Sequence, residues 1–213
     1  AMAIPALFDA CVDLAEQVVK TYDEPARDHE VVAVAMPLVL GLAAPMAEAA
    51  ENEDDETARG IVRVVSAAGE SWASVVAGAD GAEPAFVELL LACTSYADVD
   101  VAWMAFRAWW TVGDEFRELR SNNPALAEER CAMLAPYYTE LVAVMLRTAT
   151  FARGFSAAPA DVQEDFCRKL RYDVADVLLD CCAVLTVDGV LALVRGALDA
   201  HAAALMEALS VDD

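Results

Sequence analysis

The chain has 213 residues and contains little that breaks a helix or builds a turn-rich sheet. It has nine glycines and eight prolines, and no segment alternates β-branched and polar residues as half-buried strands do. It has two histidines and lacks the HExxH, GxSxG and phosphate-binding glycine motifs. These absences argue against a β-rich fold. They predict no catalytic residue, no cofactor and no enzyme.

Positive charge is also scarce. The chain carries 14 Lys and Arg against 36 Asp and Glu, a formal net charge of −22. Phosphates would be repelled by such a chain, so direct nucleic-acid binding is excluded. The excess favours basic partners and fast, salt-sensitive association with them. It equally suits a solubility role in a helical protein rich in Ala and Val.

The cysteines lack the spacing of a metal site. None of the six stands in a CxxC pair, so no zinc site and no other metal centre is expected. Cys181 and Cys182 are adjacent and could form a disulfide bond only with strain. Several of the six cysteines fall on apolar helical faces, which indicates buried thiols in a reducing compartment.

What the sequence has instead is apolar residues three and four apart, over a hydrophobic content of 58%. This spacing predicts eight helices. They cover residues 3–22, 32–46 with a kink at Pro37, 61–75, 86–93, the stretch from an N-cap at Asp98, the stretch from Asn123-Pro124, 166–185 and 191–205. Paired in order, they make about four helical hairpins opening near residues 3, 54, 98 and 161, which brackets the HEAT and armadillo period of ~40–47 residues. We therefore predict an all-α solenoid, with residues 1–213 forming a single segment and a fragment of a longer chain.

Residues 83–119 are the most aromatic part of the chain, and neither helix predicted there could bury its broad apolar surface alone. Their aromatic and large aliphatic side chains are therefore expected to pack between neighbouring repeats. The predicted repeat core is Trp72, Phe86, Leu90, Phe106, Trp109, Trp110, Phe116 and Leu178.

Residues 31–47 carry no charge and raise the question of a membrane span. The stretch is slightly short for a span, is interrupted by Pro37, Gly41 and Pro45, and is flanked by Glu30 and Glu48 rather than by basic residues. We interpret it as a buried solenoid helix and predict no membrane span.

Each of three acidic segments can be explained by local helix structure or, alternatively, by binding of a metal ion or a partner. Residues 51–56 read ENEDDE, and Asp54-Asp55 could bind magnesium in an all-helical enzyme, but no second carboxylate motif faces them. An exposed loop that favours the next helix N-terminus is the preferred interpretation. Residues 161–165 offer acid-first i,i+4 pairs with following basic residues. Asp173, Asp176 and Asp180 form a stripe that is either a solvated face or a surface for a basic partner.

Several motifs occur in an order that resembles a known family. They are RGIVRVVSAAGESWASVVAG with Gly69-Glu70-Ser71, then FVELLLACTSY, then VDVAWMAFRAWWTVGDEF, and finally EDFCRKLRYDVADVLLD. The chain resembles the central HEAT repeats of the importin-β superfamily, in the importin-thirteen/transportin-SR branch of the karyopherins.

The resemblance implies a nuclear transport receptor segment. Its partners would be Ran-GTP, basic protein cargo and nuclear pore proteins, and it would shuttle between cytoplasm and nucleus. It also implies that the second helix of each hairpin lines the concave side, and that Asp161, Glu164 and Asp165 form a secondary Ran contact. With the acidic stripe, the candidate partner-binding residues are Asp161, Glu164, Asp165, Asp173, Asp176 and Asp180. A HEAT-type scaffold without Ran dependence is the alternative, and a magnesium-dependent helical enzyme is a remote one.

Overall fold

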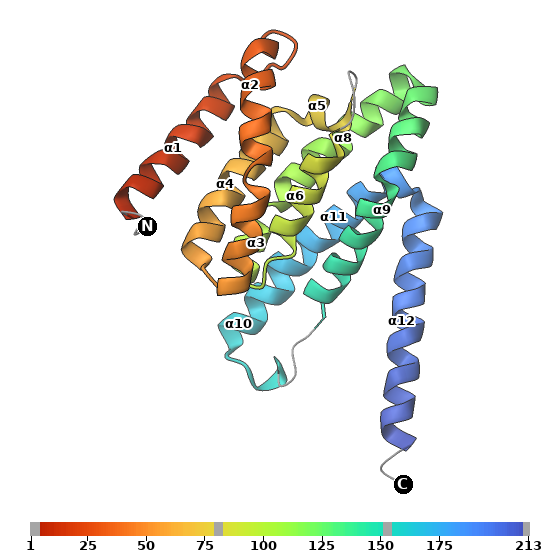
Figure 1. The fold of residues 1–213 in the computed structure, drawn as a ribbon. Helices are drawn as coiled ribbons and strands as arrows, with labels where there is room; N and C mark the ends of the chain where they lie inside the picture. The colour runs from red at the N-terminus through yellow and green to blue at the C-terminus, as the bar shows by residue number, and fades with distance from the viewer. Residues whose placement is uncertain (1–4, 79–82, 151–154, 211–213) are drawn as a thin grey trace.

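The computed structural model describes residues 5–78, 83–150 and 155–210 (Figure 1). Within them the chain is helical and holds no strand. The elements are α1 Pro5–Thr21, α2 His29–Leu40, α3 Ala43–Asn52, α4 Asp55–Ser71, α5 Ala73–Ala77, α6 Pro84–Thr94, α7 Val99–Trp103, α8 Phe106–Asn122, α9 Pro124–Thr148, a 3₁₀ turn at Phe155–Ala157, α10 Ala160–Asp165, a π-helical turn at Phe166–Leu170, α11 Arg171–Leu185 and α12 Val187–Ser210. Residues 3 and 4 of the first predicted helix lie outside the described part.

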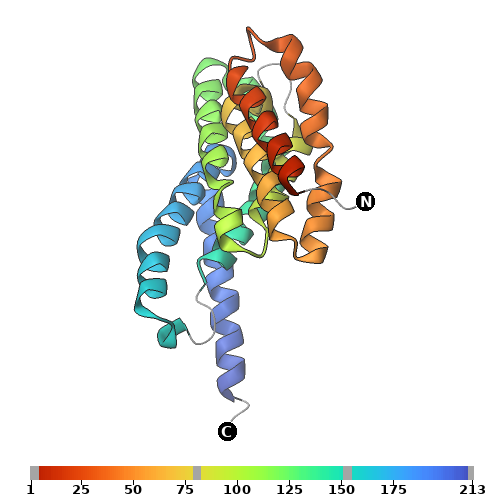
Figure 2. The ribbon, with the colours of Figure 1, turned by 90° about the vertical axis from the view of Figure 1, so that its left-hand side faces the viewer.

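The helices stack in two rows. The first row contains α1, α4, α8 and α11, each in contact with the next. The second row contains α2 with α3, then α6, α9 and α12, again in chain order. Figure 2 shows α8 and α11 on one side of the molecule and α2 and α3 on the other. This arrangement confirms the all-α, HEAT-like solenoid.

Three predicted helix starts are confirmed by side-chain caps. The Asp54 carboxylate accepts a hydrogen bond from the backbone N–H of Thr57 at 3.1 Å, at the start of α4. Asp98 caps α7 in the same way, and Asn123 caps α9 with Pro124 in its first turn. The bond from Thr57 lowers the pKa of Asp54, because it favours the ionised form. The acidic run at 51–56 thus leads into a capped helix start.

Three predicted helices are each broken in two. The helix predicted over 61–75 divides into α4 and α5 at Trp72. The other two divide at tight turns. The helix predicted over 32–46 divides into α2 and α3 at Gly41-Leu42, beyond the predicted kink at Pro37, which lies inside α2. The aromatic helix predicted from Asp98 divides into α7 and α8 at Met104-Ala105. At both breaks the backbone uses i,i+3 bonds, Leu42 N–H to Val39 and Met104 N–H to Val101. Such tight turns redirect a chain without ending it, and periodicity alone does not reveal them.

Most of the predicted repeat core is buried. The aromatic and aliphatic side chains that are less than a tenth exposed include Trp72, Phe86, Leu90, Phe106, Trp109 and Phe116. Leu178 is half-buried against this core. The prediction for Trp110 is wrong, because its side chain is 57% exposed. Trp109 occupies the inward face of α8, and the next residue on a helix points about 100° away from it.

The uncharged stretch at 31–47 lies in α2 and α3. Of the described residues, His29–Asn52 is the one helical run long and apolar enough to cross a membrane by length and composition, and 22% of its most apolar window is buried. Val32, Met36 and Met46 are buried, and the two helices contact α4 and α6. These are the contacts of a solenoid helix, but the interpretation of the stretch as buried is wrong along its outer face, where Val34 and Leu38 are 69% and 71% exposed. The absence of a membrane span stays a prediction.

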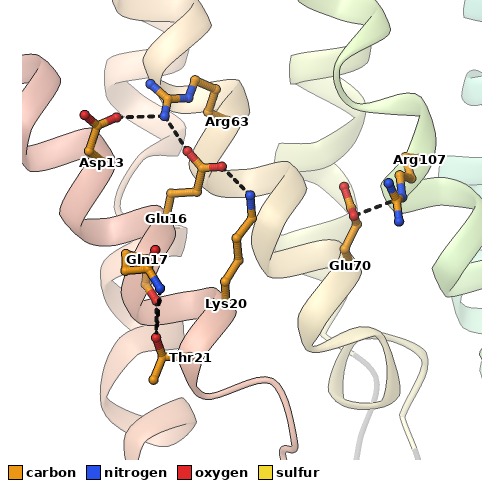
Figure 3. Close-up of polar contacts among 8 residues, drawn as sticks. All are labelled: Asp13, Glu16, Gln17, Lys20, Thr21, Arg63, Glu70 and Arg107. Atoms are coloured by element: carbon orange, nitrogen blue, oxygen red, sulfur yellow. Dashed lines mark hydrogen bonds and ion pairs between the residues drawn. The ribbon is translucent and has the colours of Figure 1, made fainter.

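Neighbouring first-row helices approach closely where glycine faces the neighbour. A Cβ built on Gly69 of α4 would lie 2.7 Å from the Cβ of Ala108 on α8. Ion pairs flank these approaches: Arg63 of α4 reaches Asp13 of α1 at 2.7 Å, and Arg107 of α8 reaches Glu70 of α4 at 3.1 Å (Figure 3). The quoted Gly-Glu motif at 69–70 therefore contributes a close contact and an ion pair to the same interface.

The cysteines divide by exposure. Cys93, Cys131 and Cys181 are buried, whereas Cys11 and Cys167 are exposed, and all six thiols are free. Burial raises the pKa of Cys93 to about 12, so its thiol stays protonated at neutral pH. The prediction that several thiols are buried is therefore confirmed at Cys93, Cys131 and Cys181.

Candidate partner-binding groove

An open groove of about 680 Å³ runs along the first row between α8 and α11. We call it the α8–α11 groove. Its lining combines aromatic side chains with carboxylates and two arginines. The residues are Glu70, Trp103, Met104, Phe106, Arg107, Trp110, Arg117, Asp173, Asp176, Val177, Leu179 and Asp180.

The aromatic part of the groove comes from α7 and α8. Trp103 ends α7 and is 44% exposed, and Trp110 lies on α8 and is 57% exposed. Leu179 of α11, 64% exposed, adds an aliphatic side chain to the lining. Large apolar side chains gathered at one exposed place often mark an interaction surface, whereas single ones do not.

The acidic part of the groove comes from α11. Asp173, Asp176 and Asp180 are three and four residues apart, which places them on one face of the helix. The structure confirms that they share a face, but the face is not uniformly solvated. Asp176 is exposed, Asp173 is half-buried and Asp180 is 4% exposed. The interpretation of all three as a solvated stripe is therefore wrong at Asp180.

Asp180 is buried because α11 approaches α8 closely there. A Cβ built on Gly113 would lie 3.1 Å from the Cβ of Asp180, so the glycine makes room for it. Arg117 of α8 forms an ion pair with Asp180 and another with Asp114 at 2.5 Å. Burial raises the pKa of Asp180 in spite of the opposing effect of Arg117. The Arg117–Asp180 pair is therefore a structural tie between α8 and α11 at the base of the groove. Little of the Asp180 side chain remains accessible to a partner.

The two outer carboxylates differ in what they contact. Asp173 accepts a hydrogen bond from the indole N–H of Trp103 at 2.7 Å, which fixes the ring at the mouth of the groove. Asp176 makes no hydrogen bond or ion pair with any residue that the structure describes. Arg107, 73% exposed, pairs with Glu70. Both arginines of the groove are thus engaged, and Asp176 offers an unmatched negative charge.

The other predicted partner-binding residues lie elsewhere. Asp161, Glu164 and Asp165 are exposed on α10, which Figure 1 shows beyond one end of α11. From Asp165 to Asp176 is 11 positions, or roughly 16 Å along a continuous helix. The structure therefore separates an α10 acidic group from the groove.

Asp54 and Asp55, the residues of the alternative magnesium site, do not converge with other ligands among the described residues. Asp54 caps α4, and Asp55 accepts a hydrogen bond from the hydroxyl of Tyr96 at 2.8 Å. Across the described residues, no three side chains among His, Cys, Asp and Glu gather closely enough to hold a metal ion. A magnesium site needs several oxygen ligands in one place, and these carboxylates are used in other contacts.

Sequence comparison relates the chain to known proteins. Residues 53–147 match the family described as the Transportin-3/Importin-13 second TPR domain. Importin-13 of Homo sapiens is 27% identical over 187 residues, covering 81% of this chain and 18% of the relative. Transportin MOS14 of Arabidopsis thaliana is 26% identical over 165 residues, covering 74% and 17%. The chain is thus similar to the importin-13 branch of the importin-β family over about four-fifths of its length.

The chain spans about a fifth of the length of the curated relatives that it matches. The matched family region begins just before α4 and ends within α9. It contains three of the four quoted motifs and the α7–α8 side of the groove. The acidic side on α11 lies beyond it. The groove thus joins the matched repeats to the next first-row helix.

The sequence interpretation missed both tryptophans as exposed groups. Trp103, Phe106 and Trp110 recur at three- and four-residue spacing in the aromatic segment 83–119, whose side chains were expected to pack between repeats. Only Phe106 of the three is buried. The sequence does show the stripe of Asp173, Asp176 and Asp180. It does not show that this stripe lies opposite the two tryptophans.

Proposed function

We propose that residues 1–213 form one solenoid segment of a nuclear transport receptor that carries basic protein cargo under the control of Ran-GTP. The observation that carries the proposal is the similarity to the importin-13 branch, whose named relatives are importins and a transportin. The role is one of binding and carriage rather than catalysis. It places the protein in both cytoplasm and nucleus, with nuclear pore proteins among its partners.

The charge of the chain supports this function. A net charge of −22 attracts basic surfaces over the ~8 Å screening distance of physiological salt and speeds their association. Two acidic places are available, the α8–α11 groove and the α10 group Asp161, Glu164 and Asp165. We assign the α10 group to a secondary contact with Ran and the groove to cargo.

Successive repeats in contact offer a route for regulation. Each first-row helix touches the next, so a change in one interface alters the curvature presented by the others. A ligand shifts such an equilibrium only through different affinities for the two shapes. Ran-GTP would act in this way if it favoured one curvature and cargo another.

The test uses the full-length protein in pulldowns with GTP-loaded and GDP-loaded Ran. We expect retention of the GTP form and a change in cargo binding when it is added. Asp161→Asn with Glu164→Gln should weaken Ran binding, whereas Glu48→Gln with Glu51→Gln on α3 removes the same charge elsewhere. Equal retention of both nucleotide forms would contradict Ran control. Cargo binding that persists unchanged would then favour a scaffold without Ran dependence.

A further inference from the structure

We infer that α12 pivots about Thr186, between the position that the structure shows and one packed along α9, and so closes a groove between these two helices. The groove has a volume of about 590 Å³ and is lined by α12, by α9 and by the two residues that follow α9. We call it the α9–α12 groove, and the position shown is its open form. The movement is independent of the proposed function, because it depends only on the backbone and packing of α12.

Thr186 joins α11 to α12 in a backbone conformation that suits threonine poorly. Its φ is 67° and its ψ is 161°. Glu53, the other described non-glycine residue with positive φ, has a ψ of 38° and lies in the left-handed helical region that helix ends commonly use. Thr186 lies outside that region, where a β-branched side chain is crowded and only glycine is unstrained. A change to negative φ would relieve the strain, and it would also turn α12 relative to α11.

The buried and half-buried side chains of α12, among those described, all lie in its first two turns. Val190 is 5% exposed, and Leu193 and Val194 are half-buried. From residue 195 to residue 204 every side chain is exposed. Figures 1 and 2 both show the far end of α12 reaching beyond the other helices. A rotation at Thr186 would therefore move the start of α12 little and its far end much further.

Apolar side chains line both walls of the groove. The α9 wall includes Val142, Ala143 and Leu146, and the α12 wall includes Val194, Ala197 and Leu198. Leu198 is 65% exposed in the open form. Packing the two walls together would remove this apolar surface from water, which is favourable. Closing is thus favoured both by the relief of strain at Thr186 and by burial of the groove walls.

The polar side chains of α9 do not oppose closing, because each has a partner on α9 itself. The hydroxyls of Thr139 and Thr150 donate to backbone carbonyls of α9, and Arg147 pairs with Glu140 at 3.4 Å. None of these contacts needs to break when α12 approaches.

The open form is held at the start of α12. The Thr186 hydroxyl accepts a hydrogen bond from the Gly189 N–H at 3.3 Å, and the buried Val190 fixes the first turn. These contacts oppose the two contributions that favour closing. A helix under such opposed contributions populates two positions, and its equilibrium shifts with small changes at the pivot or in the groove.

The test measures a distance across the groove in the purified chain by double electron–electron resonance. Ala92 of α6 and Ala203 of α12, both exposed, are replaced by p-acetylphenylalanine and spin-labelled through its ketone, which leaves the six cysteines unmodified. Ala203 lies roughly 25 Å along α12 from Thr186, so a rotation of about 10° moves it by about 4 Å. We expect two distances, of which the shorter belongs to the closed form.

Two variants of Thr186 separate the backbone strain from the hydrogen bond. Thr186→Gly relieves the strain of the open form and removes the hydroxyl, whereas Thr186→Val keeps a β-branched side chain and removes the same hydroxyl. The ratio of open to closed form should therefore be about tenfold higher in Thr186→Gly than in Thr186→Val. Equal ratios in the two variants would show that the backbone of Thr186 does not set the position of α12, and would overturn the pivot.

A second pair of variants tests the groove itself. Leu198→Glu would place a carboxylate between the apolar walls of the closed form, and should remove the shorter distance almost completely. Ala200→Glu adds the same charge on the opposite face of α12, and should leave both distances populated as before. Both side chains are exposed in the open form, and unchanged urea midpoints would show that the variants fold. A single distance that Leu198→Glu does not alter, or equal effects of the two variants, would overturn closing of the groove.

Discussion

The interfaces α1–α4 and α8–α11 are built on the same plan but differ at their outer edge. At α1–α4, Arg63 reaches both Asp13 and Glu16, and Glu16 also accepts from Lys20 at 2.5 Å (Figure 3). The cations and carboxylates of this edge are matched. At α8–α11, the arginine is tied to a buried carboxylate, and exposed indoles lie beside an unmatched Asp176.

This difference separates what holds the solenoid together from what it offers to partners. Both interfaces join adjacent first-row helices through buried apolar side chains, and such nearest-neighbour contacts are sufficient for a solenoid. The outer edge is then free to vary. At the α1–α4 edge the charged side chains pair with one another, so few charges remain for a partner. The α8–α11 edge keeps an exposed surface of aromatic and acidic side chains.

The largest expected effect comes from the buried carboxylate. Asp180→Ala should lower the free energy of unfolding by about 2–3 kcal/mol, because it leaves Arg117 with only Asp114 and opens a gap beside Gly113. The value lies below that for a fully buried pair because the Arg117 side chain is 44% exposed. Urea denaturation followed by circular dichroism measures it.

The matched variant at the other interface is Asp13→Ala. Its carboxylate is 65% exposed and Arg63 keeps Glu16, so a change within about 0.5 kcal/mol is expected. Equal losses from Asp180→Ala and Asp13→Ala would mean that the two interfaces depend alike on their ion pairs. The contrast drawn between a structural tie and a surface pair would then be lost.

A smaller effect tests how closely the helices approach. Gly113→Ala would place a Cβ 3.1 Å from that of Asp180, which is held by Arg117 and cannot move away easily. We expect a loss of about 1 kcal/mol, after allowing for the better helix propensity of alanine. Thermal unfolding would detect it.

Gly60→Ala is the control at α1–α4. Its added Cβ would meet ring atoms of Phe8 at 2.7 Å and a γ-methyl of Val12 at 3.0 Å, but the Phe8 atoms lie at the far end of a side chain that can rotate, and the Val12 contact is at a side-chain tip. The change in stability should stay within about 0.5 kcal/mol, because the propensity gain offsets the repacking. A larger loss at Gly60 than at Gly113 would reverse the assignment of the tighter interface.

The sequence predicted the architecture well because the repeat imposes one rule throughout. Apolar residues three and four apart marked nearly every helix, and Asp54, Asp98 and Asn123 marked three of their starts. The apolar spacing did not predict the breaks at Gly41-Leu42 and Met104-Ala105, because a single tight turn keeps that spacing on both sides. Element type follows from local pattern, whereas a bend depends on what the helix packs against.

The groove could be predicted only in part. The Asp stripe on 173–180 was visible, and so was the aromatic stripe on 103–110, but their juxtaposition depends on how α8 and α11 meet across more than sixty residues. Burial of Asp180 depends in turn on Gly113 and Arg117, which carry no signal of their own in the sequence. Pairing between repeats is a long-range property that periodicity does not contain.

The smallest effect is a pH dependence that differs in sign between the interfaces. Burial would raise the pKa of Glu16, but its hydrogen bonds with Lys20 and Arg63 outweigh this and lower it below the ordinary 4.5. The stability that Glu16 contributes is therefore present above pH 4.5 and lost as pH falls through its lowered pKa. For Asp180 the raised pKa gives the opposite slope: ionisation of its buried carboxyl lowers stability as pH rises above the ordinary 3.8 and through the raised pKa. Its packing beside Gly113 and its ion pair with Arg117 remain at neutral pH. Glu16→Gln should cost less than about 1 kcal/mol at neutral pH and almost nothing near about pH 3, as urea denaturation across that range would show. A cost for Glu16→Gln that grew toward acid pH would contradict the pairing at the α1–α4 edge.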